Sequence, residues 1–393
     1  MLQKGITMTI VITGAGSGGH VTPLLAVAEE IRAIDKTANI VFIGQKGDPF
    51  GLRLEGSELI NEAIFISAGK FRRYHSEGWK QLLDLPTIFK NFVDFFKFLI
   101  GLIQAYSVLG KIKPDIIFIK GGYIGVPVGL AAALRKIKYI THDSDTMPGL
   151  ANRIIAKWAI MHATGMPTEF YDYQKDKTVY VGVPISAEYS LVDEDMQNAF
   201  KKNLGFESAD KLILFTGGGL GSKVLNDSLV EITKKLLSSD EKIRIMNIAG
   251  NENEEEVRGA FSNKLSSEEI DRLTIKGFVT DLHKYSGAAD LIISRAGATN
   301  IAEFAAQAKA CVIIPSPYLV GGHQIKNAES LVKINAIEII DEADLQYNPE
   351  VLLDKITELM NSKSKREELG KNLHKIAKLN ASKDLAKLII DEK

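Results

Sequence analysis

Short runs of apolar, often β-branched residues alternate along this chain with longer stretches of helical character. The apolar runs predict strands at residues 9–13, 40–43, 116–119, 138–141, 211–216, 244–249, 290–294 and 311–315. Helices are expected between them, at residues 23–33, 126–134, 223–237 and 298–308. Most of these runs are almost wholly apolar, which is typical of strands buried on both faces. The alternation of strand and helix predicts α/β architecture with parallel sheets.

The alternation pauses at residues 184–205 and then restarts with a strand and a glycine-rich turn. We therefore expect two Rossmann-like domains, 1–186 and 187–393, with the last helix able to pack back on the first domain. A chain of 393 residues is long enough for two such domains. Residues 1–7 carry no pattern, so either Met1 or Met8 could be the true start.

Composition excludes several classes of protein. With 45% hydrophobic and 25% charged residues, the chain can bury enough apolar surface to fold. A formal net charge of -1 predicts no general attraction to nucleic acid. A single cysteine, Cys311, excludes an internal disulfide framework and, with no secretory signal pattern, favours a reducing cytoplasm. The most apolar stretch, 88–106, is interrupted by Lys90, Asp94 and Lys97, so no transmembrane span is expected.

Two glycine-rich loops are candidates for anion binding. The first, GAGSGGH at 14–20, follows a strand and leads into a helix, whose N-terminal N–H groups attract phosphate. It spells the dinucleotide fingerprint, but the second strand ends in Ile43-Gly44-Gln45 without the acidic residue of that motif, which weakens the nicotinamide interpretation. A tight turn without a ligand stays open for this loop.

The second loop, TGGGLGSK at 216–223, also lies between a strand and a helix. Its spacing fails the P-loop pattern, yet three consecutive glycines indicate close approach to a ligand. Ligands of open α/β sheets bind at the carboxyl ends of strands, so we expect both loops to face one interdomain cleft.

Six stretches of the chain, in order and over nearly its whole length, resemble one family. They are GSGGHVTPLLAVAEEI (16–31), GGYIGVPVGLAA (121–132), THDSDTMPGLANRIIAK (141–157), TGGGLGSKVLND (216–227), SRAGATNIAEFAA (294–306) and GGHQIKNAESL (321–331). The chain is similar to the MurG-type transferases, which have the two-domain GT-B fold. This resemblance implies an inverting enzyme that moves N-acetylglucosamine from UDP-GlcNAc to the 4-hydroxyl of the muramyl sugar in undecaprenyl-linked lipid I, forming lipid II for peptidoglycan.

The resemblance also implies roles for individual residues. His20 matches the family's favoured general base, and Glu303 matches the acid that takes the ribose hydroxyls. The other donor-binding positions would be Gly16, Ser17, Gly18, Gly19, Gly218, Gly219, Leu220, Gly221, Ser222, Arg295, Gly297, Ala298, Thr299, His323, Gln324 and Asn327. Structural alternatives stay open, namely helix capping for His20, a favourable helix-dipole position for Glu303 and a capping cluster for residues 323–327.

On the acceptor side the resemblance implies Tyr123, His142 and Asp145. The alternatives are a core aromatic residue and a strand-end histidine with its hydrogen bonds satisfied. Asp143-Ser144-Asp145 spells D-x-D, a metal-binding pattern of a different glycosyltransferase fold. GT-B enzymes use helix N-termini instead, so we expect no metal and no other cofactor.

The chain departs from the family at several positions. Residues 143–145 replace Glu, Gln and Asn, and Gly219 and Leu220 replace a serine and a glutamine. Ser186 stands where the family often has an arginine. These changes leave open another GT-B transferase with a different UDP-sugar or a glycolipid acceptor, and a non-catalytic UDP-sugar-binding protein.

A lipid-linked acceptor implies a peripheral enzyme on the cytoplasmic face of the membrane. Arg72, Arg73 and Trp79 are candidates for contact with anionic lipid headgroups. They precede a predicted amphipathic helix that carries Phe92, Phe95 and Phe96, and such a helix could lie in the membrane interface. An amphipathic core helix is the alternative.

Overall fold

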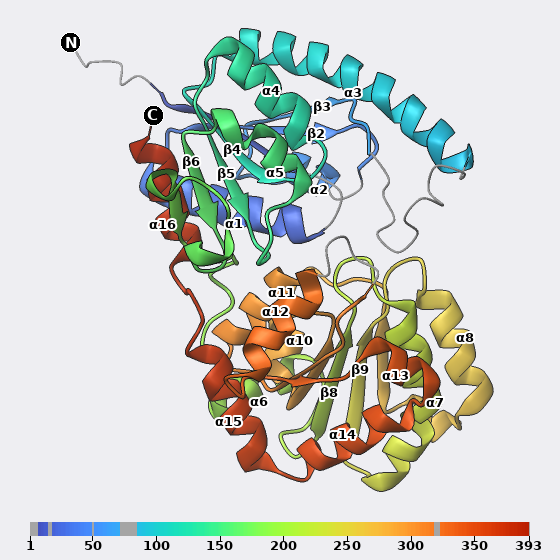
Figure 1. The fold of residues 1–393 in the computed structure, drawn as a ribbon. Coiled ribbons are helices and arrows are strands. Elements are labelled where there is room, and N and C mark those ends of the chain that lie inside the picture. The colour runs from blue at the N-terminus through green and yellow to red at the C-terminus, as the bar shows by residue number, and fades with distance from the viewer. Residues whose placement is uncertain (1–6, 15–17, 49–50, 71–84, 318–322, 393) are drawn as a thin grey trace. The chain divides into compact units, whose positions relative to one another are not determined.

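The chain folds into two compact units. The computed structural model describes residues 7–14, 18–48, 51–70, 85–317 and 323–392, and it describes the backbone alone for residues 18–20, 53, 85, 86 and 323. Unit 1 comprises Met1–Ser186 and Lys378–Lys393, and unit 2 comprises Ala187–Ala377 (Figure 1). The chain thus leaves unit 1 at Ser186 and returns to it with its last helix.

Unit 1 is built on a parallel sheet of seven strands in the order β3-β2-β1-β4-β5-β6-β7. The strands are β1 (Thr9–Gly14), β2 (Asn39–Gln45), β3 (Glu62–Ile66), β4 (Ile116–Gly121), β5 (Tyr139–Asp143), β6 (Met161–Thr164) and β7 (Thr178–Tyr180). The helices are α1 (Gly18–Ile34), α2 (Gly51–Glu55), α3 (Leu85–Ile112), α4 (Gly125–Arg135), α5 (Leu150–Ile155) and α16 (Ala381–Asp391).

Alternate side chains of the unit 1 strands enter two separate cores. Ile10 and Ile12 pack with the helices α1 and α16 on one face of the sheet. Val11 packs with α3 and α4 on the other face. Both layers can be followed in Figure 1, where α16, at the red end of the chain, lies beside the blue helix α1. Burial on both faces explains why these strands are nearly continuous apolar runs.

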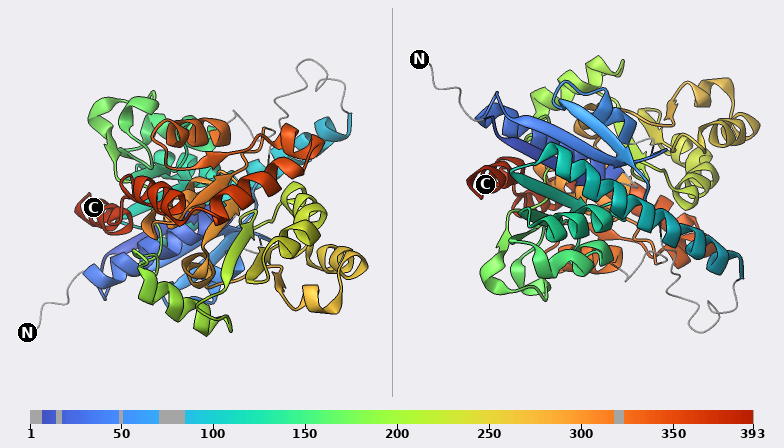
Figure 2. Two further views of the ribbon diagram at one scale, coloured as in Figure 1. Left: turned by 90° about the horizontal axis from the view of Figure 1, so that it is seen from below. Right: turned by 90° about the horizontal axis from the view of Figure 1, so that it is seen from above.

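Helix α3 has one buried side and one exposed apolar side. Asp94, Gly101, Ala105 and Leu109 are buried toward the unit, and a Cβ atom at Gly101 would lie 2.0 Å from the Ser67 carbonyl oxygen, so the helix packs very closely there. Seen from above, α3 crosses in front of the strands of unit 1 (Figure 2). The exposed apolar side carries Ile88, Phe89, Phe92, Val93, Phe95, Phe96, Leu99, Ile100, Ile103 and Tyr106.

Unit 2 contains a parallel sheet of six strands in the order β10-β9-β8-β11-β12-β13. The strands are β8 (Lys211–Thr216), β9 (Ile243–Ile248), β10 (Leu273–Lys276), β11 (Leu291–Ser294), β12 (Cys311–Ile313) and β13 (Glu338–Ile339). The helices are α6 (Glu194–Asn203), α7 (Lys223–Ser239), α8 (Glu254–Lys264), α9 (Ser267–Ile270), α10 (Leu282–Ala288), α11 (Ala298–Ala306), α12 (His323–Val332), α13 (Glu342–Tyr347), α14 (Glu350–Met360) and α15 (Lys363–His374).

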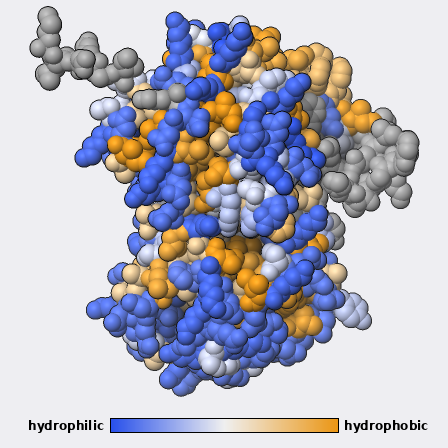
Figure 3. All heavy atoms as spheres, turned by 60° about the vertical axis from the view of Figure 1, so that its left-hand side comes forward, coloured by the Kyte–Doolittle hydropathy of each residue, from blue (hydrophilic) through white to orange (hydrophobic). Residues whose placement is uncertain are grey.

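The two faces of the unit 2 sheet also have separate cores. Ile213 and Phe215 pack with α7, α8 and α14. Leu212 and Leu214 pack with α10, α11 and α12. On the visible side of unit 2 the surface is mainly hydrophilic toward its lower end, whereas hydrophobic residues gather near the upper margin of unit 1 (Figure 3).

The predicted α/β architecture of two Rossmann-like, parallel-sheet domains is confirmed. The helix expected from residue 23 is placed too late, because α1 already begins at Gly18 and Pro23 lies inside it. The sequence pattern also missed the short strands β3, β6, β7, β10 and β13, which have two to five residues and are in part only half-buried. The expectation that both glycine loops line one interdomain cleft stays a prediction.

Candidate functional site

The carboxyl ends of β8 and β11 form the candidate donor site of unit 2. These strands pair directly, and the chain order of the sheet reverses between them. This reversal is where open α/β sheets bind ligands. The loop after β8 leads into α7, and the loop after β11 leads into α11, so two helix N-termini lie at this point of the sheet. A Cβ atom at Gly218 would lie 3.7 Å from Asn300 Nδ2, which places the glycine loop against the first turn of α11.

The glycine loop needs its glycines for two physical reasons. Gly218 and Gly221 have φ angles of 82° and 76°, a region that residues with a Cβ rarely adopt. A Cβ atom at Gly221 would also lie only 2.0 Å from the carbonyl oxygen of Ala249, and one at Gly217 would lie 2.4 Å from the Gly221 carbonyl carbon. The loop is therefore a tightly packed backbone structure.

Some of the backbone amides that are expected to donate hydrogen bonds to phosphate already have hydrogen-bond partners within the loop. The Gly218 amide donates to Thr216 Oγ1 at 3.3 Å, and the Gly221 amide donates to the Gly218 carbonyl at 3.0 Å. Ser222 caps α7, since its hydroxyl accepts from the Leu225 amide at 3.4 Å. The expectation that all four amides from Gly218 to Gly221 serve the ligand stays a prediction, and the amides of Gly218 and Gly221 would have to exchange or share their present partners. Within the described residues, the amides of Gly219 and Leu220 keep no such partner.

Helix α11 carries Glu303 in its second turn. Gly297 is the N-cap residue of this helix, followed by Ala298 and Thr299. The Glu303 side chain is only 4% exposed, and burial raises the pKa of its carboxyl to about 8, against the opposing effect of a hydrogen bond from Tyr189. Tyr189, which sequence reasoning did not select, lies just after the passage from unit 1 and is 9% exposed. Its selection would have required knowledge of the fold, because the two residues lie far apart in the sequence.

Arg295 is held by another residue of unit 2. Its guanidinium forms an ion pair with the buried Glu342, at the start of α13, and donates to the Ile314 carbonyl at 3.2 Å. The Arg295 side chain is mostly buried in this contact. The structure thus gives Arg295 a structural partner at the end of β11, and its contact with a ligand stays a prediction.

Three further residues proposed to bind the sugar donor lie at the start of α12. This helix begins at His323, earlier than the helix start expected near Lys326. Gln324 is buried, and its Oε1 accepts from the Ser316 amide at 2.9 Å, so it ties the helix to the segment after β12. Asn327 is fully buried. The structure describes only the backbone of His323.

In unit 1 the structure places His20 in the first turn of α1, not in a loop ahead of the helix. Gly18 and Gly19 form the same turn, whereas Gly16 and Ser17 lie outside the described residues. The amino end of α1 follows β1 at the carboxyl edge of the sheet, where Gly14 pairs with Gly121 of β4. This is the edge at which a ligand of unit 1 would bind.

The three acceptor candidates differ in accessibility. Tyr123 is partly exposed, and its hydroxyl bonds the side chain of Gln45. Asp145 is also partly exposed, and its carbonyl accepts from the Tyr171 hydroxyl at 2.6 Å. His142 is fully buried, and its Nε2 lies 2.9 Å from the Gly182 carbonyl. This contact satisfies one ring nitrogen, as the strand-end alternative expects, and contact of His142 with an acceptor stays a prediction.

A buried polar cluster that the sequence did not reveal surrounds Asp143. Its carboxylate accepts from the Gly149 amide at 2.8 Å, Asn152 Nδ2 at 3.0 Å and the Tyr173 hydroxyl at 2.8 Å. Burial nonetheless raises the pKa of Asp143. Lys120, also buried, feels the charge of Asp143, while burial lowers the pKa of its amine to about 8. Asp143 thus has a structural role, and among the described residues no group of three or more His, Cys, Asp or Glu side chains is placed to hold a metal ion.

The residues proposed to contact the membrane fall into two groups. Arg72, Arg73 and Trp79 lie outside the described residues. The aromatic residues Phe92, Phe95 and Phe96 lie on α3 and are 60%, 45% and 49% exposed. The alternative of a core helix is therefore wrong for this side of α3. By length and composition alone, Thr87–Ile112 would also suffice to cross a membrane.

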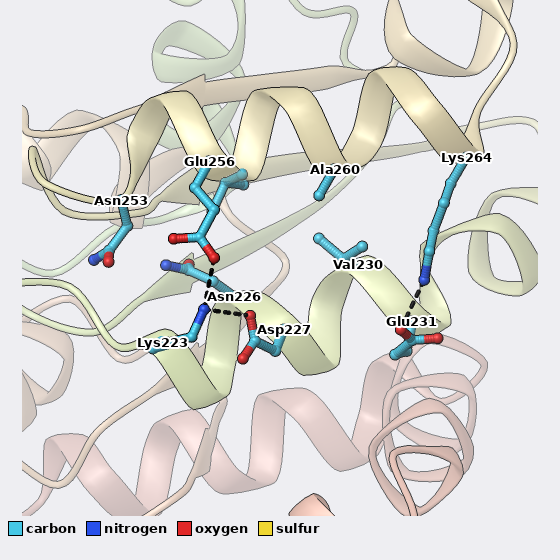
Figure 4. Close-up of a pocket in the computed structure, with 10 residues that line it drawn as sticks. Lys223, Asn226, Asp227, Val230, Glu231, Asn253, Glu256, Ala260 and Lys264 are labelled. Carbon is cyan, nitrogen blue, oxygen red and sulfur yellow. Dashed lines mark hydrogen bonds and ion pairs between the residues drawn. The ribbon is translucent and has the colours of Figure 1, made fainter.

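A polar groove of about 280 Å³ lies between α7 and α8 (Figure 4). Both of its lysines are paired, since Lys223 contacts Glu256 at 2.7 Å and Lys264 contacts Glu231 at 2.7 Å, and Asp227 adds a third carboxylate to the lining. Exposed pairs of this kind contribute little energy. We assign no function to this groove.

Comparisons with known proteins agree with this geometry. The glycosyltransferase family 28 N-terminal domain matches residues 10–163, and the family 28 C-terminal domain matches residues 212–389. The chain is 32% identical to the UDP-N-acetylglucosamine--N-acetylmuramyl-(pentapeptide) pyrophosphoryl-undecaprenol N-acetylglucosamine transferase of Thermoanaerobacter sp. (strain X514), with 97% of this chain and 99% of that protein covered. The protein of the same name from Clostridium tetani is 33% identical, with 91% of each chain covered.

Solved structures show the same fold. The crystal structure of Acinetobacter baumannii MurG superimposes with a TM-score of 0.69 at 25% identity, covering 98% of this chain and 99% of that one. The co-structure of Staphylococcus aureus MnaA with UDP has a TM-score of 0.66 at 13% identity, covering 96% and 95%, and shows a likeness of fold alone. With both domains and full-length relatives matched, this chain belongs to glycosyltransferase family 28, among the MurG-type enzymes.

Proposed function

We propose that this protein transfers N-acetylglucosamine from UDP-GlcNAc to the 4-hydroxyl of the muramyl sugar in undecaprenyl-linked lipid I, with inversion at the sugar C1. Its full-length relatives carry the name of this transferase. The observation that carries the proposal is the donor site of unit 2. There a tightly packed glycine loop and two helix N-termini meet at the strand-order reversal, with the buried carboxyl of Glu303 on the second helix.

The donor site suits a nucleoside diphosphate. Helix N-termini carry partial positive charge and stabilise phosphate. The amides of Gly219 and Leu220, together with the N-terminus of α7, would face the diphosphate. The Glu303 carboxylate would accept hydrogen bonds from the two ribose hydroxyls, since a carboxylate has about four acceptor positions.

The chemistry requires one proton transfer and one displacement. His20 takes the proton of the acceptor 4-hydroxyl as general base, and the acceptor oxygen bonds to C1 of the sugar. The bond from C1 to the diphosphate oxygen breaks at the same time, and UDP leaves. The charge that develops on UDP would be stabilised by the helix N-termini of unit 2, whose orientation the fold fixes before the reaction.

We further propose that the reaction needs no metal ion, because helix dipoles and amides supply the positive potential at the diphosphate. The test is turnover after treatment with EDTA and passage over a desalting column. Unchanged turnover supports this proposal. Loss of turnover that Mg²⁺ or Mn²⁺ restores would overturn it.

We propose that the exposed side of α3 lies on the cytoplasmic face of the membrane. The apolar side chains from Ile88 to Tyr106 would enter the acyl boundary. The exposed Lys90 would face anionic headgroups, whereas Lys97 pairs with Asp94 at 3.3 Å. The opposite side of α3 is buried against unit 1, which favours a helix lying on the membrane over a helix crossing it.

Substrate identity is tested by a panel of radiolabelled donors and lipid acceptors. The donors are UDP-GlcNAc, UDP-glucose and UDP-GalNAc, and the acceptors are a short-chain lipid I analogue and diacylglycerol. We expect transfer from UDP-GlcNAc to the lipid I analogue at the highest kcat/KM. A preference for another donor and acceptor would favour a related transferase. This alternative stays open because Ser186, Gly219 and Leu220 depart from the family pattern. UDP binding without transfer to either acceptor would favour a non-catalytic protein.

A further inference from the structure

Tyr189 is the residue that contacts the Glu303 carboxyl from outside its own helix. It lies in the segment that opens unit 2, ahead of α6, and its hydroxyl donates a hydrogen bond to Glu303. Both side chains are buried, at 9% and 4% exposed. A buried phenol hydroxyl requires a partner, and here that partner is the side chain to which the ribose is assigned.

The Tyr189 ring is fixed by its neighbours. It meets the ring of His283 edge-on, with centroids 6.0 Å apart, and His283 meets Phe200 in the same manner at 6.1 Å. Glu188, the preceding residue, lies 3.4 Å from His283 Nδ1. The hydroxyl of Tyr189 therefore has little freedom to leave the Glu303 carboxyl.

Burial and the nearby negative charges keep the Tyr189 phenol protonated, so it can donate a hydrogen bond to Glu303. Burial and the negative groups Glu303, Glu188 and Asp281 raise the pKa of Tyr189 well above its ordinary value, so the phenol keeps its proton at any working pH. The hydrogen bond stabilises the charged form of Glu303 and lowers its pKa, opposing the larger effect of burial. Without Tyr189, the Glu303 carboxyl would hold its proton to higher pH and would be a poorer acceptor for ribose hydroxyls.

We propose that Tyr189 is a positioning residue for the donor nucleotide, which fixes the Glu303 carboxylate and leaves its remaining lone pairs for the ribose diol. This inference rests on the proposed function, in which Glu303 binds the ribose. It adds a residue that acts through Glu303 and not through contact with the ligand.

The test is the affinity for UDP, measured by calorimetry from pH 6.5 to 9.5 on the full chain. Tyr189→Phe keeps the ring packing and removes the hydroxyl alone. We expect it to weaken UDP binding roughly tenfold at pH 7, which is typical for loss of one hydrogen bond to a charged group. We expect the loss to shrink toward pH 9.5, where Glu303 is ionised in both proteins. KM for the donor should rise, whereas kcat at saturating donor should stay close to that of the unchanged protein.

Two further variants separate positioning from general destabilisation. Tyr139→Phe removes a buried phenol hydroxyl from unit 1, where it donates to the Ile155 carbonyl at 2.5 Å, and should leave UDP affinity unchanged. In a Glu303→Ala background, which leaves the Tyr189 hydroxyl no acceptor at this position, Tyr189→Phe should have no further effect on UDP affinity. Equal or tighter UDP binding by Tyr189→Phe at pH 7, an unshifted pH profile, or an additive loss in the double variant would overturn the inference.

The outcomes also separate this inference from the proposed function. If the unchanged protein binds no UDP and transfers no sugar, the proposed function fails. If it binds UDP through Glu303 while Tyr189→Phe behaves like the unchanged protein, only the positioning role fails.

Discussion

Glu303 shows how burial sets the chemistry of one side chain. Its ordinary pKa of 4.5 is raised to about 8 in the fold, because a charged carboxylate is costly in an apolar environment. In the proposed function, the ionised form is the one that would accept hydrogen bonds from both ribose hydroxyls. On this proposal, donor binding and ionisation of Glu303 are linked.

We predict that affinity for UDP rises as pH increases from 7 through about 8, because ionised Glu303 is the better acceptor. UDP binding at pH 7 should release protons, which calorimetry in buffers of different ionisation enthalpy detects. In Glu303→Gln the affinity should be lower and the dependence above pH 7 absent. A wild-type affinity that is flat over this range would contradict the assignment.

The same shift has a consequence for stability. For a carboxyl whose folded pKa is raised, the stabilising contribution is complete below pH 4.5 and is lost as pH rises toward 8. Glu303→Gln should therefore lose less unfolding free energy than the unchanged protein between pH 5 and 8. Chemical denaturation at both pH values measures the difference, and equal losses in both proteins would show that Glu303 does not titrate as described.

His20 is the second residue whose replacement has a clearly predicted effect on activity. As general base it should contribute roughly 10²- to 10⁴-fold to kcat, so His20→Ala should lose that factor. UDP affinity should change far less than kcat, because the proposal assigns the diphosphate and the ribose to Gly219, Leu220 and Glu303 of unit 2. Steady-state kinetics and calorimetry on the same variant decide this. An intact kcat would remove His20 from the mechanism.

At the scale of elements, the glycine loop after β8 is the most constrained turn of the donor site. We predict that Gly221→Ala destabilises the protein by about 1–3 kcal/mol, since φ of 76° is strained for alanine and its Cβ would meet the Ala249 carbonyl. UDP affinity should fall with it. Thermal unfolding with and without UDP measures both effects.

Gly259→Ala is the matched control for this loop. Gly259 lies exposed inside α8, and a Cβ atom added there would meet no described atom within 4 Å beyond its chain neighbours and the backbone of its own helix. Alanine there should stabilise by about 0.5–1 kcal/mol, as for any helix interior. Similar behaviour of the two variants would mean that the loop geometry is not required.

Helix α3 carries a prediction of its own. Replacing Phe89, Phe92 and Phe96 together by serine should weaken binding to anionic vesicles roughly tenfold or more, because each exposed ring would lose its burial in lipid. Phe170→Ser, at a ring that is 50% exposed elsewhere in unit 1, serves as control. Vesicle sedimentation measures the binding. Equal binding by the triple variant would exclude this side of α3 as the contact.

At the scale of the whole molecule, the sequence was informative where burial makes the pattern continuous. The inner strands β1, β2, β4 and β8 read as apolar runs because both faces are covered. The edge strands β3, β7 and β13 did not stand out, since they are short and half-buried.

The contacts of the candidate site were harder to foresee, because they join residues far apart in the chain. The ion pair of Arg295 with Glu342 and the bond of Tyr189 to Glu303 depend on how the helices of unit 2 pack. Lys120 reads as part of a strand, and only the fold shows that it is buried near Asp143. Motifs could predict which residue types belong to the candidate site, whereas they could not predict which of these residues contact one another.

The central claim is that unit 1 and unit 2 together carry an inverting N-acetylglucosamine transfer. NMR analysis of the product formed by the purified chain from UDP-GlcNAc and a short-chain lipid I analogue tests it most directly. We predict a β-linked N-acetylglucosamine on the 4-oxygen of the muramyl sugar and one UDP released per sugar transferred. An α-linked product, or UDP release without a glycosylated acceptor, would contradict it.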